Sequence, residues 1–284
     1  MNSMKDCYEL ANGVKIPCMG YGTYKAAEGN NEGIIKTAIE AGYRYFDTAS
    51  FYDTEEALGR AIHESGIPRE EFFLTSKAWK TEMGYEEVKK AFAQTLEKLG
   101  TDYLDMYLIH WPLPNPEYKD WKELDVETWR GLEELYKAGK VKAIGVSNYQ
   151  THHLADLLEE AEIIPAVNQI ECYPYLSQAA TIQYCLERNI RPEAWGPLGA
   201  GKSDILTNPV ITEIAKKRGL TPAQVVLGWN LERGVIVIPK SIHKERLTEN
   251  LKCTDFELTD EDMTRISALN KNLRLGADPD HFNF

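Results

Sequence analysis

Short hydrophobic segments typical of β-strands alternate along the chain with longer amphipathic segments typical of α-helices. A first pair of strand-like segments, 8–10 and 14–16, flanks Asn12-Gly13, a dipeptide that favours the tight turn of a β-hairpin. Eight further strand candidates follow, at residues 18–21, 44–47, 72–77, 103–110, 143–147, 166–170, 190–195 and 235–239. Strands that alternate with helices pair in parallel, so the pattern predicts a parallel sheet with crossover helices.

The segments between the strands repeat apolar residues at helical spacing, at 31–41, 54–65, 85–99, 126–138, 151–160, 178–188 and 222–232. Gly42, Gly100 and Gly139 each follow such a segment, as expected for a glycine that ends a helix. Eight strand-helix units in 284 residues have the proportions of an α/β protein with a single (β/α)₈ TIM barrel. No Ser/Gly-rich linker divides the chain, so we expect one domain over residues 1–284.

Composition and charge limit the kinds of molecule that the protein is expected to bind. The net charge of −12 and the pI near 5.1 argue against general attraction to nucleic acid or to an anionic membrane. The N-terminus lacks an apolar signal core and no segment has the roughly 18 apolar residues of a membrane helix, which predicts a cytoplasmic protein. The cysteines are scattered without a Cys-x-x-Cys pair, so neither a disulfide framework nor a metal site is expected.

Four polar residues lie at or just beyond the ends of successive strand candidates. Asp47, Lys77 and His110 close the second, third and fourth strands, and Tyr52 follows in the loop after the second. Catalytic groups of a (β/α)₈ barrel come from the C-terminal ends of its strands and the following loops. The acid, the phenol, the ammonium and the imidazole are therefore expected to meet at one mouth of the barrel.

These side chains suit proton donation to an oxygen atom. An ammonium next to a phenol lowers the phenol pKa from its usual value near 10, so Lys77 is expected to make Tyr52 a better acid. Asp47 would keep Lys77 charged, and a neutral His110 could donate a hydrogen bond to a carbonyl oxygen. A carbonyl that receives hydride from a nicotinamide needs this chemistry. Taken singly, each residue also fits a structural role, such as a cap or packing.

The chain resembles the aldo-keto reductase superfamily, in particular bacterial NADPH-dependent aldehyde and diketogluconate reductases. The matching stretches span most of the sequence, at residues 20–24, 42–49, 52–59, 75–77, 107–112, 145–148, 168–171 and 238–241. The resemblance implies a catalytic set of Tyr52 as general acid with Asp47, Lys77 and His110. It also implies NADPH-dependent reduction of a small-molecule aldehyde or ketone without a metal, by a monomer.

Cofactor contacts carry over from the resemblance residue by residue. Ser147, Asn148 and Gln169 match the side chains that hold the nicotinamide carboxamide, and Trp195 matches the aromatic residue that stacks on the ring. Further contacts are implied for Gly22, Thr23, Tyr24, Asp47, Gly196, Pro197, Leu198, Gly199 and Lys202. Lys240, Ser241 and Arg246 match the group that binds the 2′-phosphate of adenosine, with Glu249 and Asn250 beside the adenine. Two cations and a hydroxyl suit a dianionic phosphate, which predicts NADPH rather than NADH.

The substrate pocket is expected to have aromatic walls. Tyr24, Trp79 and Trp111 resemble the family's pocket residues, with His110 positioning the carbonyl, although an isolated aromatic residue is more often core or rim packing than a ligand contact. The C-terminal tail, 274–284, is short and resembles that of the bacterial members. A short tail predicts a shallow and permissive pocket.

Two other functions fit parts of the sequence. Residues 196–203 satisfy the P-loop pattern G-x-x-x-x-G-K-[ST] after a strand-like segment, which alone would indicate a nucleotide triphosphatase. That mechanism requires the Lys and Ser to begin a helix, whereas Pro209 predicts a helix start only there. The third possibility is a non-catalytic barrel that only binds a ligand, because a fold does not fix a function.

Overall fold

A closed ring of eight parallel strands forms the centre of the protein. The computed structural model describes residues 7–26, 33–112 and 120–281. The strands hydrogen-bond in chain order, β3 (Tyr21–Gly22), β4 (Tyr45–Asp47), β5 (Phe73–Ala78), β6 (Leu104–Ile109), β7 (Val141–Ser147), β8 (Val167–Glu171), β9 (Arg191–Trp195) and β10 (Ile236–Val237). A parallel bridge between Met19 and Val237 joins the two ends, with the Gly20 N–H 2.9 Å from the Val237 carbonyl oxygen. The predicted (β/α)₈ barrel is confirmed.

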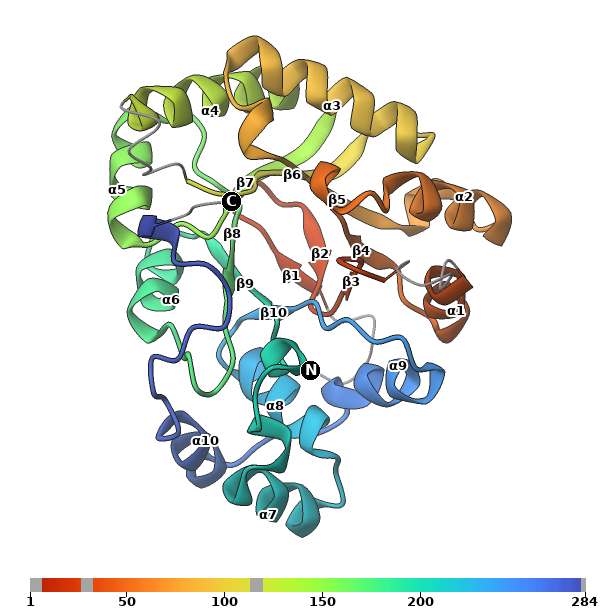
Figure 1. Ribbon diagram of the computed structural model, residues 1–284, viewed down its shortest axis with the longest axis vertical. Coiled ribbons are helices and arrows are strands. Elements are labelled where there is room, and N and C mark those ends of the chain that lie inside the picture. Colours follow the sequence, from red (N-terminus) through yellow and green to blue (C-terminus); the bar gives the residue numbers. More distant parts are fainter. Residues whose placement is uncertain (1–6, 27–32, 113–119, 282–284) are drawn as a thin grey trace.

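Helices cover the outside of the ring (Figure 1). They are α1 (Gly33–Ala41), α2 (Glu55–Ser65), α3 (Tyr85–Leu99), α4 (Trp121–Lys137), α5 (Thr151–Glu160), α6 (Ala179–Leu186), α7 (Pro209–Arg218), α8 (Pro222–Glu232), α9 (Lys244–Leu251) and α10 (Asp260–Ser267). Helices α3, α5 and α8 have the bounds that the apolar spacing predicts. Gly100 ends α3 with φ +63°, a left-handed conformation that glycine adopts without strain. Within the described ranges, no helix combines the length and apolar character needed to cross a membrane.

Most predicted elements differ from the structure by one or two residues at an end, and two differ by more. The first barrel strand is β3 rather than residues 18–21, because Met19 pairs with Val237 on the opposite side before Tyr21 pairs with Phe46. Helix α4 begins at Trp121 instead of residue 126, so it has an extra turn. The first two residues of the predicted helix 31–41 lie outside the described residues.

The predicted N-terminal hairpin is present and closes one end of the barrel. Its strands, β1 (Cys7–Glu9) and β2 (Lys15–Pro17), pair antiparallel and lie across the middle of the ring in Figure 1. Leu10 and Ile16 are buried in one cluster with the inward-facing barrel side chains Tyr45, Phe73, Met106, Leu108, Ala143, Val167, Ile236 and Ile238. Apolar packing therefore fills this end, and the polar residues described below lie at the opposite, C-terminal ends of the strands.

Candidate active site

The four polar residues predicted to converge do meet at the C-terminal ends of neighbouring strands. Asp47 ends β4, Lys77 lies near the end of β5, and His110 follows β6 directly. The Lys77 Nζ atom is 2.6 Å from Asp47 Oδ1 and 2.9 Å from the carbonyl oxygen of Thr48. The Tyr52 hydroxyl is 3.3 Å from Nε2 of His110, and Lys77 Nζ is 5.0 Å from the centroid of the Tyr52 ring. The phenol, the imidazole and the ion pair thus form one group.

A short turn holds Tyr52 in this group. Residues Ser50–Tyr52 form a single 3₁₀ turn after β4. The Ser50 hydroxyl donates to Glu82 at 2.6 Å, and the same Glu82 oxygen accepts the backbone N–H of Trp79 at 2.7 Å. Glu82 therefore ties the turn that carries Tyr52 to the loop that follows β5.

Burial controls the proton affinities at this site. Burial and the nearby charge of Lys77 lower the pKa of His110 well below 6.5, which keeps the imidazole neutral as expected. Burial, and then the negative charge of Asp47, raise the pKa of Tyr52 well above 10. The prediction of a lowered pKa for Tyr52 is wrong for the protein without ligands, because burial and the charge of Asp47 raise that pKa. Tyr52 therefore carries its proton.

Below these four residues lies a buried network that was not predicted from the sequence. Gln169 Nε2 is 2.7 Å from Asp47 Oδ2 and 2.5 Å from Glu193 Oε1, and the Tyr45 hydroxyl is 2.7 Å from Glu193 Oε2. Burial raises the pKa of Asp47, whereas the Lys77 ammonium and the Gln169 N–H favour its carboxylate form. The signal for Glu193 was an acidic residue inside a strand candidate, where apolar residues are the rule.

The residues expected at the carboxamide lie together at the ends of β7, β8 and β9. Asn148 follows β7 in a left-handed conformation, φ +66°, and its Oδ1 accepts the indole N–H of Trp195 at 2.8 Å. Its Nδ2 donates to the His110 carbonyl at 3.0 Å and lies 3.1 Å from the Ser147 hydroxyl oxygen. These bonds fix the plane of Trp195 relative to the loop that carries His110.

The strand β3 end and the loop after β9 border the same mouth. Gly22 pairs with Asp47, and the hydroxyl of the buried Thr23 lies 2.9 Å from that of Thr54. After Trp195, Gly196 and Pro197 lead into a 3₁₀ turn at Gly199–Gly201, which follows Leu198 and precedes the exposed Lys202. The next helix, α7, begins at Pro209 with Asn208 as its cap. Lys202 and Ser203 therefore do not begin a helix, and the context that a P-loop requires is absent.

Two exposed cations flank the start of α9. Lys240 and Arg246 are exposed, and in the described ranges no ion pair engages either of them. The Ser241 hydroxyl accepts the backbone N–H of His243 at 3.1 Å. Of the pair expected beside the adenine, Glu249 is half-buried and Asn250 is buried. Two exposed cations that have no ion-pair partner among the described residues suit a phosphate dianion, so these residues could hold a phosphate group of a nucleotide cofactor.

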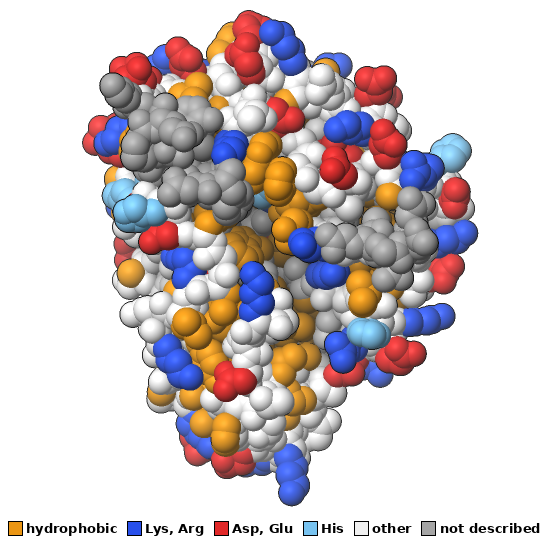
Figure 2. All heavy atoms as spheres, viewed as in Figure 1, with side chains coloured by type: hydrophobic (Ala, Val, Ile, Leu, Met, Phe, Trp, Pro, Cys, Tyr) orange, Lys and Arg blue, Asp and Glu red, His pale blue; other side chains and the backbone are white. Residues whose placement is uncertain are grey.

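Aromatic side chains surround the Tyr52 hydroxyl. The Tyr24 ring is 48% exposed with its centroid 4.9 Å from that of Tyr52, and the Trp79 centroid is 5.0 Å from that of His110. Phe51, which the sequence analysis missed, is 45% exposed and stacks on Trp79 at 3.9 Å. Trp111 is buried. The space-filling view shows a recess with hydrophobic side chains at its edge near the centre of one face (Figure 2).

The C-terminal segment packs against the same strand ends. The backbone N–H groups of Leu275 and Gly276 donate to the two carboxylate oxygens of Glu171, at 2.7 and 3.0 Å. A Cβ atom on Gly276 would lie 2.5 Å from the Trp195 ring. Only a glycine lets the chain approach the indole this closely, so the segment covers the outer part of Trp195.

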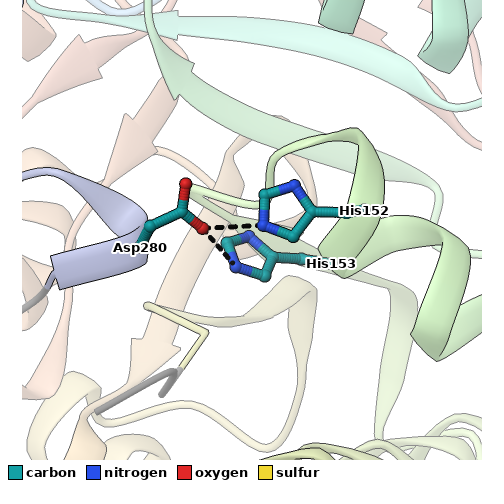
Figure 3. Close-up of side chains that lie close together, drawn as sticks. All are labelled: His152, His153 and Asp280. Atoms are coloured by element: carbon teal, nitrogen blue, oxygen red, sulfur yellow. Dashed lines mark hydrogen bonds and ion pairs between the residues drawn. The ribbon is translucent and has the colours of Figure 1, made fainter.

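Two histidines hold the end of this segment (Figure 3). Nε2 of His152 and Nε2 of His153 lie 2.7 and 3.1 Å from Asp280 Oδ1. This geometry resembles a metal site, but Nδ1 of His153 accepts the backbone N–H of Gln150 at 3.1 Å, which places the ring proton on Nε2. A metal needs that atom without a proton. The cluster therefore fits an anchor for the C-terminal segment better than a metal site.

Comparison with known proteins agrees with this geometry. A sequence profile of the Aldo/keto reductase family matches residues 18–271. The chain is 50% identical over 283 residues to a protein named "Glyoxal reductase" from Bacillus subtilis (strain 168), with 99% of each chain covered. The solved structure of MGS-M4, an aldo-keto reductase from a deep-sea metagenome library, has a TM-score of 0.92 at 42% identity and covers 98% of this chain and 100% of its own. A structure of an aldo-keto reductase (AKR2E5) complexed with NADPH has a TM-score of 0.88 at 35% identity, with 95% and 89% covered.

The barrel and its relatives define an oxidoreductase of the (β/α)₈ class. The chain belongs to the aldo-keto reductase family, which confirms the resemblance inferred from its motifs. Members of this family reduce carbonyl compounds and use a nicotinamide cofactor.

Proposed function

We propose that this chain reduces aldehydes or ketones to alcohols with NADPH, and that Tyr52 is the general acid. The observation that carries the proposal is the contact of the Tyr52 hydroxyl with a neutral His110, beside the buried Lys77–Asp47 ion pair. The relative named for glyoxal supports small α-dicarbonyl compounds as the first substrates to test. A monomeric state, a cytoplasmic location, a single domain over residues 1–284 and the absence of a metal stay predictions from the sequence.

The side chains divide the work of moving one proton. A substrate carbonyl oxygen would lie between the Tyr52 hydroxyl and Nε2 of His110, which are close enough to contact one oxygen atom together. The neutral imidazole donates a hydrogen bond that orients the oxygen, and Tyr52 gives its proton as negative charge develops there. Lys77, held by Asp47, then stabilises the resulting phenolate. The aromatic residues Tyr24, Phe51 and Trp79 would exclude water.

NADPH would supply the hydride when bound beside these groups. Ser147, Asn148 and Gln169 are the candidates for its carboxamide, and Trp195 offers a flat surface for the ring. Lys240, Ser241 and Arg246 would bind the 2′-phosphate, because a paired cation and hydroxyl set favours a dianion over the hydroxyl of NADH. The loop 196–202 is the candidate for contacts with the pyrophosphate.

Replacing the proposed acid is the first test. Tyr52→Phe removes only the hydroxyl, so we expect kcat for aldehyde reduction to fall by roughly 10²- to 10⁴-fold, the usual contribution of a general acid. NADPH affinity, measured by fluorescence titration, should stay near the wild-type value. Tyr24→Phe, which removes a nearby hydroxyl, is the matched control. Comparable turnover in Tyr52→Phe would show that another group donates the proton.

Replacing one cation tests the cofactor preference. Arg246→Ala should weaken NADPH at least roughly tenfold, because a charge-assisted hydrogen bond to phosphate is lost, and should leave NADH binding almost unchanged. Dissociation constants for both cofactors are the measurement. Lys244→Ala removes an exposed cation from the same helix and serves as control. Equal losses for NADPH and NADH would contradict the role of Arg246.

The alternatives give different results in the same assays. A triphosphatase would hydrolyse ATP without an aldehyde, but residues 196–203 lack the helix start that this chemistry needs. A non-catalytic barrel would bind NADPH without consuming it. Absence of aldehyde-dependent NADPH oxidation over a broad panel of aldehydes, ketones and α-dicarbonyls would reject the proposed function.

A further inference from the structure

Both N–H groups of the Gln169 side-chain amide donate hydrogen bonds to carboxyl groups. Nε2 lies 2.7 Å from Asp47 Oδ2 and 2.5 Å from Glu193 Oε1. An amide nitrogen has two hydrogens, so both donors are used. Among the described residues, the remaining polar atom, the carbonyl oxygen Oε1, has no hydrogen-bond partner. If the amide were turned over, this oxygen would face two carboxyl oxygens instead, which is unfavourable next to the carboxylate of Asp47.

Glu193 lies beside the apolar cluster inside the barrel, because its partner Tyr45 belongs to that cluster. It pairs directly with Gln169 across β8 and β9, and it is fully buried. Met106, Leu108 and Ile236 belong to the apolar cluster inside the ring. A buried carboxyl group is unfavourable unless it is hydrogen-bonded, and this one has two partners, Gln169 and the Tyr45 hydroxyl.

Glu193 can accept from Gln169 in either protonation state. Burial, and then the charge of Asp47, raise the pKa of Glu193 to about 8, so it carries a proton at neutral pH. Oε2 accepts from the Tyr45 hydroxyl when Glu193 is ionised and donates to the Tyr45 oxygen when it is protonated there, and in both forms Oε1 accepts the Gln169 N–H. Asp47 differs from Glu193 in its second partner, because its other oxygen, Oδ1, accepts a hydrogen bond from Lys77 Nζ. Asp47 and Glu193 therefore each accept a different hydrogen of the Gln169 amide, and together they fix its orientation.

We propose that Glu193 is a positioning residue that fixes the amide of Gln169 with its carbonyl oxygen toward the nicotinamide. Gln169 then acts as an acceptor only, and it selects cofactors whose 3-substituent carries an N–H donor, as the carboxamide does. Without Glu193, one Gln169 N–H is released and can turn toward the ring. An amide that presents a donor no longer distinguishes a carboxamide from a ketone at that position. This inference rests on the proposed role of Gln169 in cofactor binding.

The test compares NADP⁺ with its 3-acetylpyridine analogue, in which a methyl ketone replaces the carboxamide. The wild-type protein should bind NADP⁺ roughly 3- to 10-fold more tightly than the analogue, the usual effect of one hydrogen bond. Glu193→Met keeps the length of the side chain, removes the acceptor and adds no charge at neutral pH. In this variant the ratio of the two dissociation constants should approach one. Glu193→Gln keeps an acceptor oxygen and should keep the wild-type ratio.

A purely structural role of Glu193 gives a different pattern. It would lower the thermal stability of Glu193→Met and weaken both cofactors equally, leaving the ratio unchanged, and that result overturns the proposal. Equal loss of the ratio in Glu193→Gln and Glu193→Met would also overturn it. If Glu193→Met does not fold, the wild-type ratio decides, because a wild-type protein that binds both cofactors equally well has no acceptor there. Failure of the proposed function is recognised separately: a wild-type protein that binds neither cofactor has no cofactor site, and one that binds NADPH without aldehyde-dependent oxidation of it is not a reductase.

Discussion

At the scale of single residues, Tyr52 and His110 are both held in their neutral forms. Burial raises the pKa of Tyr52 and lowers that of His110, so neither side chain changes charge near neutral pH. The same desolvation acts on an acid and on a base and moves their pKa values apart. In the proposed reaction, Tyr52 would thus be a proton donor next to an uncharged hydrogen-bond donor, His110, over a wide range of pH.

This arrangement predicts a flat pH profile. With saturating NADPH, kcat/KM for an aldehyde should vary less than about twofold between pH 6 and 9, because Tyr52 stays protonated and His110 stays neutral. Steady-state rates across that range are the measurement. The contrary result is a wild-type activity that falls as the pH is lowered, with an apparent pKa near 6.5, while the activity of His110→Gln does not. That result would show that His110 titrates at its usual value.

At the scale of elements, helices α2 and α3 approach each other at a glycine. A Cβ atom on Gly59 would lie 2.6 Å from the backbone carbonyl oxygen of Leu99, the last residue of α3. This contact lies beside Glu55, which accepts the hydroxyls of Ser76 and Thr95 at 2.7 and 2.9 Å and so joins α2 to β5 and α3. Close packing at Gly59 therefore supports the strand that carries Lys77.

Gly59→Ala should destabilise the protein although alanine favours helices. The clash is with backbone, which has to move, and overpacking of this kind costs about 1–3 kcal/mol, more than the ~1 kcal/mol gained from helix propensity. Urea unfolding gives the difference in the free energy of unfolding. Gly33→Ala in α1 is the control, because nothing lies within 4 Å of its added Cβ. If Gly59→Ala is as stable as Gly33→Ala, the two helices are not tightly packed at this point.

At the scale of the whole molecule, buried carboxyl groups make stability depend on pH. Burial raises the pKa of Asp125 in α4 to about 8, and its Oδ2 accepts the Tyr149 hydroxyl at 2.8 Å. Burial also raises the pKa of Glu193 to about 8. The folded protein holds these protons while the unfolded chain releases them near pH 4. Their contribution is therefore complete below about pH 4 and is lost as the pH rises toward 8.

Asp125→Asn should remove one such proton and flatten this dependence. Relative to the wild-type protein, the variant should gain stability as the pH rises from 5 to 8, by on the order of 3 kcal/mol, since one proton contributes about 1.4 kcal/mol per pH unit. Urea unfolding at pH 5, 6.5 and 8 is the measurement. Asp102→Asn, at an exposed position, controls for the loss of one carboxylate. A constant difference between variant and wild type would mean that Asp125 is ionised in the folded protein.

The fold was predictable because local patterns and topology agree. Each strand candidate was short, apolar and bounded by turn residues, and glycines such as Gly100 marked helix ends. The bounds of β3 were not predictable, since the pairing of Met19 with Val237 depends on closure of the ring between distant segments. Helices α9 and α10 were not proposed, although Thr259 followed by Asp262 is a recognisable helix start.

The site was predictable at the strand ends and not beneath them. Asp47, Lys77 and His110 followed from their places in the sequence, because parallel strands bring their C-terminal ends together. Glu193 was missed because its contact with Gln169 depends on the register of β8 and β9. The direction of the Tyr52 pKa was wrong because sequence names neighbouring charges but not the loss of water around the phenol.

The N-terminal hairpin limits access to the site to one end of the barrel. Because Leu10 and Ile16 fill that end, substrate, product and solvent all reach Tyr52 through the opposite opening. In the proposed reaction, Tyr52 loses its proton in every cycle and has to recover one from water. Reprotonation of Tyr52 and release of the alcohol therefore use the same opening of the barrel. A bulky product that leaves slowly also delays reprotonation.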